Sequence, residues 1–176
     1  MMINLLFASL VSFGAAPVKA SAKVETKLEF VSRFELPAGF KYKKTQVGGL
    51  SGAVYNPDTE TWILISDDRG RINEPRLYEF KFSSQPFRAE VVGVQFLKKK
   101  NQKKWAKNVL DAEGITLLPW ANYLISSEGD NNQKPRVMPT LFDAKADGTV
   151  VRDFALPDEM LPEPAGHQSK GIPNNM

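Results

Sequence analysis

The stretch that decides the fold of this chain is GGLSGAVYNPDTETWILISDDRG, residues 48–70. Residues 50–55 and 61–66 within it are rich in apolar and β-branched side chains, which favour strands. The tripeptide Asn56-Pro57-Asp58 between these runs consists of residues that dominate turns. The stretch therefore predicts a β-hairpin.

Neighbouring segments extend this hairpin into a sheet. Downstream, Tyr78, Phe80 and Phe82 alternate with charged residues, and a fourth strand-like run covers residues 90–97. Upstream, residues 28–36 alternate in the same way and predict a half-buried N-terminal strand. Four consecutive antiparallel runs predict the kind of sheet that forms one blade of a β-propeller.

The same order of strands and acids returns in a second unit, made of residues 112–118, 123–130 and 149–156. Gly114 follows Gly52 by 62 residues, whereas Glu128 follows Asp68 by 60. We attribute the difference to a hairpin turn that is two residues shorter, because turns tolerate length changes that strands do not. The period predicts repeated supersecondary units, and a chance likeness of two hairpins is the alternative.

These features predict an all-β protein built from β-propeller-like four-stranded antiparallel repeats, with about two blades plus an N-terminal strand. A closed ring usually needs about four blades or more, so we expect an incomplete propeller. A chain of 176 residues has room for one domain, which we assign to residues 21–176. The net charge of +3 is small and indicates no class of charged partner.

Residues 1–20 have the features of a secretory signal peptide. An apolar stretch covers residues 3–18, which is short for a membrane span, and small residues at Ala20 and Ala22 mark candidate cleavage sites. No Lys or Arg precedes this stretch, and an uncleaved amphipathic anchor or a buried strand are the alternatives. We expect export to a periplasmic or extracellular location, with no stable membrane insertion after cleavage. The absence of cysteine excludes disulfides and a lipid-modified Cys.

Acidic residues recur where the two units should place them together. In a four-stranded meander, the start of the first strand and the end of the second lie at the same end of the sheet. Clustered carboxylates at that end suit a hard divalent cation such as calcium. The alternative is that these acids are turn formers that accept hydrogen bonds from loop amides. The predicted metal ligands are Asp67, Asp68, Asp111, Glu113, Glu128 and Asp130.

Arginines follow these acids closely in both units. Arg69, Arg76 and Arg136 are the predicted substrate-binding residues, because a guanidinium makes bidentate contacts with phosphate. The alternative is that each Arg pairs with a neighbouring acid and stabilises a loop. The substrate-binding interpretation predicts that the substrate is a phosphate-bearing small molecule. The candidate catalytic acids, which would act on an attacking water, are Asp68, Glu113 and Glu128.

Other functional classes find little support. Residues 98–107 carry six Lys, but only Trp105 is interleaved, so we expect a solvated loop and no nucleic-acid binding. His167 is the single histidine and lies in a Pro- and Gly-rich tail, which argues against a Ser/His/Asp triad. Residues 48–52 are better interpreted as an entry turn than as a phosphate-binding glycine loop.

The chain resembles the phytase-like (esterase-like activity of phytase) domain family. The matching pieces lie between residues 48 and 175, in the order GGLSG at 48–52, SDDRG at 66–70, DAEGI at 111–115, SSEGD at 126–130 and Pro135-Arg136. The resemblance implies a propeller-like fold, a centre of recurrent Asp and Glu that is catalytic or binds metal, and a phosphoesterase-like activity. It also implies further blades after GIPNN at 171–175, so we expect a C-terminally truncated member.

Three hypotheses follow from these observations. The first is an exported, metal-dependent phosphoesterase or esterase that uses the clustered acids. The second is a non-catalytic binding propeller whose acids hold a structural calcium ion. The third is a truncated, inactive fragment whose open strand edge associates with another chain.

Overall fold

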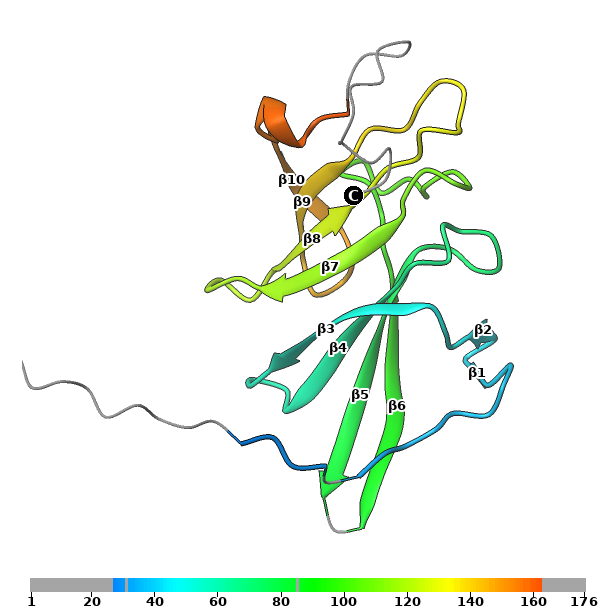
Figure 1. The fold of residues 1–176 in the computed structure, drawn as a ribbon, viewed down its shortest axis with the longest axis vertical. Helices are drawn as coiled ribbons and strands as arrows, with labels where there is room; N and C mark the ends of the chain where they lie inside the picture. The colour runs from blue at the N-terminus through cyan, green and yellow to red at the C-terminus, as the bar shows by residue number, and fades with distance from the viewer. Residues whose placement is uncertain (1–26, 31, 85, 163–176) are drawn as a thin grey trace, which may run out of the picture. The chain divides into compact units, whose positions relative to one another are not determined.

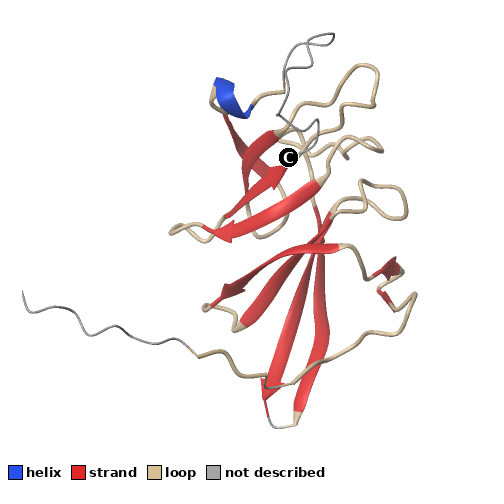
Figure 2. Ribbon diagram, in the orientation of Figure 1, coloured by secondary structure: helices blue, strands red, loops and turns tan. Residues whose placement is uncertain are grey.

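A computed structural model of the chain describes residues 27–30, 32–84 and 86–162. The predicted signal peptide at residues 1–20 and the tail that contains His167 lie outside the described residues. Strands and loops make up almost all of the described chain, with one short 3₁₀ helix, η1 (Asp158–Met160) (Figure 2). The predicted all-β class is confirmed. Among the described residues, no helix is long and apolar enough to cross a membrane.

The first four-stranded sheet is antiparallel and follows chain order (Figure 1). Its strands are β3 (Leu50–Asn56), β4 (Thr61–Ser66), β5 (Arg76–Ser84) and β6 (Phe87–Phe96). The predicted hairpin is the β3–β4 pair, and Asn56 shapes its turn by accepting a hydrogen bond from the Asp58 backbone N–H at 3.0 Å. A side-chain carbonyl that accepts from the backbone two residues on replaces a ladder bond where the chain reverses.

The second four-stranded sheet has the same antiparallel order (Figure 1). Its strands are β7 (Ala112–Leu117), β8 (Tyr123–Ser127), β9 (Thr140–Ala144) and β10 (Val150–Phe154). The predicted second repeat is therefore confirmed. Strand β9 was not located from the sequence, because its five residues carry no alternation that distinguishes them from the loop before them.

Both sheets contain the same irregularity on their first strand. The register shifts between Leu50 and Gly52 in β3, and between Ala112 and Gly114 in β7. An extra residue is thus accommodated at the equivalent place in each unit, as in a β-bulge. The predicted 62-residue period of the first strand is confirmed by this shared feature.

The predicted 60-residue period of the second strand is wrong by one residue. Tyr55 pairs with Trp62, and its counterpart Leu117 pairs with Tyr123, which is 61 residues after Trp62. Asp67 is therefore the structural counterpart of Glu128, in place of Asp68. Matching acid to acid in the sequence hid this shift, because two adjacent Asp residues offer two alignments of equal quality.

The predicted N-terminal strand is also wrong. No strand is present in residues 27–30 or 32–36, and Leu28 and Phe30 are 94% and 82% exposed. Alternation records which side chains are apolar, but a strand also requires a hydrogen-bonding partner. The chain instead forms a short ribbon from β1 (Lys41–Tyr42) and β2 (Thr45–Gln46).

Two apolar clusters stabilise this arrangement. One lies between the two four-stranded sheets and includes Ile65 of the first and Ile125 of the second, both fully buried. The other lies on the opposite face of the first sheet, where Tyr78 and Phe80 pack with Val47. Each large apolar side chain buried in this way stabilises the fold by about 1.5–3 kcal/mol. Sheets stacked face to face, without closure among the described residues, form a propeller-like arrangement that is incomplete.

Contact between the inner strands β3 and β7 brings the loops of the two units together. Ser51 Oγ donates a hydrogen bond to the Ala112 carbonyl at 2.9 Å. Gly52 lies so close to β7 that a Cβ at this position would be 2.7 Å from the Glu113 carbonyl oxygen. The absence of a side chain at Gly52 therefore permits the approach that places acids of both units around one hollow.

Candidate functional site

Acidic side chains gather where β7 begins and β8 ends. Asp111, Glu113 and Glu128 each offer a carboxylate oxygen, and these oxygens lie within 4.8 Å of one another. Asp111 precedes the bulge, Glu113 occupies it, and Glu128 follows directly after β8. The antiparallel pairing of β7 with β8 thus assembles three of the predicted metal ligands at one end of the sheet.

Arg69 enters this acidic cluster from the first unit. Its Nη2 contacts Asp111 Oδ2 and lies 3.2 Å from Glu128 Oε1, and its Nη1 lies 3.4 Å from Asp130 Oδ2. The Arg69 backbone has a positive φ of 55°, and its carbonyl accepts a hydrogen bond from the Asn108 N–H at 2.8 Å. A fixed loop of one unit therefore inserts a cation among the acids of the other.

Two of the crowded carboxylates, Glu113 and Glu128, hold protons more tightly than isolated ones. Burial raises the pKa of Glu113 above its ordinary value, and the charges of Asp111 and other nearby acids raise it further. Burial also raises the pKa of Glu128, and the neighbouring Asp111 carboxylate raises it further. Arg69 opposes both effects without cancelling them. The site consequently has an excess of negative charge that an additional cation would relieve.

Asp130 differs from its neighbours. Its carboxylate accepts hydrogen bonds from the Asn132 backbone N–H at 2.8 Å and from Gln133 Nε2 at 3.1 Å. The Asn132 bond is the main reason why the pKa of Asp130 is lowered. Asp130 is therefore ionised over a wide pH range and anchors both its own loop and Arg69.

The residues present fit a divalent cation. Asp111 Oδ2 is buried and accepts no hydrogen bond from the described residues, although it lies in the ion pair with Arg69. Three carboxylates with oxygens this close together are the donor type that hard cations prefer. Asp111, Glu113 and Glu128 could therefore hold a metal ion, and their chemistry does not distinguish which one.

A hollow of about 440 Å³ opens beside these acids. Its lining residues come from both units and comprise Asp67, Asp68, Arg69, Arg71, Ile72, Asp111 and Glu113. Asp67 can reach the hollow because Gly49 has no side chain. A Cβ on Gly49 would lie 2.0 Å from Asp67 Oδ1. The volume is large enough for a small molecule.

Arg71 and Ile72 are lining residues that sequence reasoning missed. Arg71 is exposed, and its Nε donates to Asn108 Oδ1 at 3.0 Å. Ile72 is 60% exposed. The residues 61 positions further along the chain are Asn132 and Gln133, so the repeat provided no signal for Arg71 and Ile72. Only the path of the loop after β4 brings them to the hollow.

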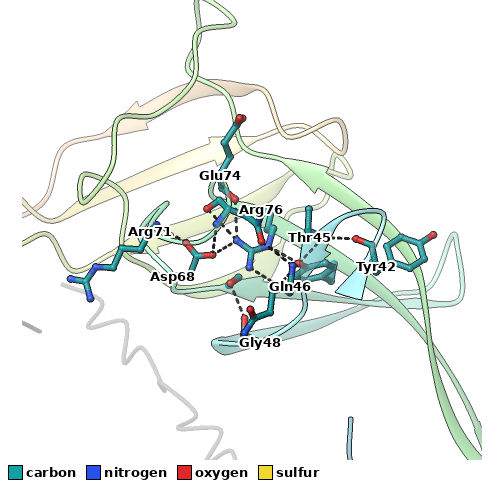
Figure 3. Close-up of polar contacts among 11 residues, drawn as sticks. Tyr42, Thr45, Gln46, Gly48, Asp68, Arg71, Glu74 and Arg76 are labelled. Carbon is teal, nitrogen blue, oxygen red and sulfur yellow. Dashed lines mark hydrogen bonds and ion pairs between the residues drawn. The ribbon is translucent and has the colours of Figure 1, made fainter. Parts of the chain in front are cut away.

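Asp68 lines the hollow, but its carboxylate is engaged in a polar network around the buried Arg76 (Figure 3). Asp68 is in an ion pair with Arg76 and accepts hydrogen bonds from the backbone N–H groups of Arg71 and Asn73. Arg76 is 1% exposed, and its Nη2 donates to the Gln46 carbonyl at 2.7 Å. This placement favours a structural role, in which the pair fixes the loop after β4 onto β2. It supports the turn-forming alternative more than catalysis by Asp68 or substrate contact by Arg76.

Arg136 is placed differently from the residue it echoes in the sequence. Arg76 begins β5, whereas Arg136 lies in the loop four residues before β9 and is half-buried. The strand register makes Thr140 the counterpart of Arg76, since Ser127 pairs with Thr140 at the start of β9. The Pro-Arg echo is thus not a structural equivalence, and the substrate-binding role of Arg136 stays a prediction.

Comparison with known proteins adds one finding. A family model described as "Phytase-like: Esterase-like activity of phytase" matches residues 45–176. This range includes both four-stranded sheets and all residues that line the hollow. No curated protein and no solved structure matches the chain.

Proposed function

Because this chain belongs to the phytase-like family, we propose that it is a phosphoesterase-type hydrolase of phosphate-bearing small molecules. One observation supports this most directly. Asp111, Glu113 and Glu128 each place a carboxylate oxygen within 4.8 Å of the other two, and this cluster lies beside the hollow. In the proposed reaction, water attacks phosphorus and the ester P–O bond breaks. The products are inorganic phosphate and an alcohol.

We assign the cation-holding role to Asp111, Glu113 and Glu128, and calcium is the ion that we favour for an all-carboxylate set. When bound, such a cation supplies positive charge against the phosphoryl oxygens. Asp67 lines the same hollow and could add a further oxygen ligand. Asp130 would contribute indirectly, because it contacts Arg69 at 3.4 Å.

Phosphate recognition is assigned to Arg71. Its guanidinium lies at the hollow, and Figure 3 shows it pointing away from the buried Asp68–Arg76 network. A guanidinium donates paired hydrogen bonds to phosphate oxygens, which orients the ester for attack. Arg71 thus takes the role that the sequence had suggested for Arg76.

Proton transfer is assigned to Glu113. A carboxylate has two oxygens, so Glu113 could contact the cation through one oxygen and accept a proton on the other. Glu113 also lines the hollow, so it can reach a water molecule next to a bound ester. In the proposed reaction, Glu113 accepts the proton of the attacking water.

The test is hydrolysis of p-nitrophenyl phosphate by the chain after chelation and after calcium is restored. We expect turnover to disappear with chelator, to return with calcium, and to be lost in Glu113→Gln. Glu159→Gln is the matched control, because Glu159 is an exposed residue of η1 and lies outside the hollow. Calcium-independent turnover would remove the metal from the mechanism. A calcium-induced rise in melting temperature without turnover on phosphate esters would favour the binding propeller.

We also propose that the protein is exported, on the basis of the apolar stretch and small-residue sites in residues 1–20. N-terminal sequencing of protein recovered from the periplasm or medium tests this. A mature terminus at Ser21 or Lys23 is expected, and an intact Met1 on an exported chain would contradict cleavage.

A further inference from the structure

Arg69 is the cation that occupies the acidic cluster in this structure. Its Nη2 contacts Asp111 Oδ2 and lies 3.2 Å from Glu128 Oε1. Asp111 and Glu128 are also two of the three residues whose oxygens could hold a metal ion. The guanidinium and a divalent cation would therefore require the same carboxylates.

The Arg69 backbone is fixed independently of these contacts. Its carbonyl accepts from Asn108, and the preceding residue Asp68 is held by the ion pair with Arg76. A non-glycine residue with φ of 55° persists only where the surrounding structure determines it. Departure of the guanidinium from the acids would therefore need rotation of the side chain alone, with the loop unchanged.

We propose that Arg69 is a tethered counter-ion that competes with a divalent cation for Asp111 and Glu128. Cation binding displaces the guanidinium, which then joins Arg71 in the hollow that both residues line. This inference rests on the proposed function and adds an order of events to it. The cation binds first, and the Arg69 guanidinium then turns into the hollow. Because coupling between two ligands is reciprocal, calcium strengthens the binding of a phosphate-bearing ligand, and that ligand strengthens the binding of calcium.

Calorimetric titration of calcium into the full chain tests this competition. We compare the wild-type protein with Arg69→Ala and Arg71→Ala. Arg71 is a matched control because it lies in the same loop and carries the same charge, while its side chain contacts Asn108 and not the acids. We expect Arg69→Ala to bind calcium on the order of tenfold more tightly than wild type, within the usual range of coupling between sites. Arg71→Ala should bind calcium with nearly wild-type affinity.

Removal of Arg69 leaves the carboxylates without their counter-ion and can weaken the metal-free fold. We therefore add Arg69→Gln, which keeps a polar side chain of similar reach without the charge, and follow thermal unfolding as calcium is raised. Both Arg69 variants should melt at a lower temperature than wild type without calcium. They should also show a larger calcium-induced rise in melting temperature.

Two results would overturn the inference, and they differ in what else they affect. If all chains bind calcium but the Arg69 variants bind it equally or more weakly, Arg69 does not compete, and the proposed metal-dependent function stands. If none of the chains shows calcium binding or a calcium-dependent rise in melting temperature, the metal site fails and the competition fails with it.

Discussion

Asp67 and Glu128 occupy equivalent positions in the two units. The Asp67 backbone N–H donates to the Gly49 carbonyl at 2.8 Å, and the Glu128 N–H donates to the Asp111 carbonyl at 3.2 Å. Each acid therefore follows the second strand of its sheet and is bonded to the residue that enters the first strand. One acid from each unit reaches the site by the same local geometry. The Asp next to Asp67 is free to serve a different purpose.

That purpose is to pair with Arg76, and the pair should be essential to stability. Asp68→Asn leaves the fully buried Arg76 guanidinium without its counter-ion, and breaking a buried pair in this way costs roughly 3–5 kcal/mol. Denaturant unfolding measures this loss. Lys104→Ala is the control, because it breaks the exposed 2.6 Å ion pair with Glu74 and should cost about 1 kcal/mol or less. Equal losses in the two variants would contradict the structural role of Asp68.

The close approach of β3 to β7 should depend on Gly52. In Gly52→Ala the new Cβ would lie 2.7 Å from the Glu113 carbonyl oxygen, which is backbone and cannot rotate away. Overpacking of this kind destabilises by about 1–3 kcal/mol, and it should also weaken calcium binding by shifting Glu113. Gly48→Ala is the matched control, because nothing lies within 4 Å of a Cβ there. Denaturant unfolding and calcium titration of both variants test whether stability and calcium binding depend on Gly52.

Glu113 should lower the stability of the metal-free protein as pH rises through the acidic range. The pKa of Glu113 is raised by burial, so the folded chain binds more protons than the unfolded chain above the ordinary value of 4.5. Its unfavourable contribution is therefore absent below 4.5 and is complete once pH exceeds the raised pKa. Glu113→Gln, melted with chelator present over a series of pH values, should gain stability relative to wild type as pH rises. A difference between the two proteins that does not grow with pH would contradict this assignment.

Arg71→Ala should impair hydrolysis without impairing metal binding. Loss of a paired guanidinium–phosphate contact should raise KM and lower kcat/KM for p-nitrophenyl phosphate by on the order of tenfold or more. Calcium affinity should stay near the wild-type value, since the Arg71 side chain contacts Asn108 and none of the three metal-holding acids. An unchanged kcat/KM would mean that a residue other than Arg71 recognises the phosphate.

Local patterns in the sequence were sufficient for much of the fold. Apolar runs around the turn at residues 56–58 predicted the β3–β4 hairpin, and the spacing of Gly52 and Gly114 predicted the second unit. The same patterns failed at residues 28–36, where alternation without a partner strand formed no sheet. They failed again at Arg136, because an echo of two letters does not report strand register.

The sequence by itself determined that two acidic sheet ends recur, because strand alternation and turn residues are local properties of the chain. Only the tertiary structure decided how those acids are used. Contact between β3 and β7 placed Arg69 among Asp111, Glu128 and Asp130, and burial committed Asp68 to Arg76. Charges of opposite sign pair according to distance and solvent exposure, and neither quantity is encoded in the spacing of residues along a chain.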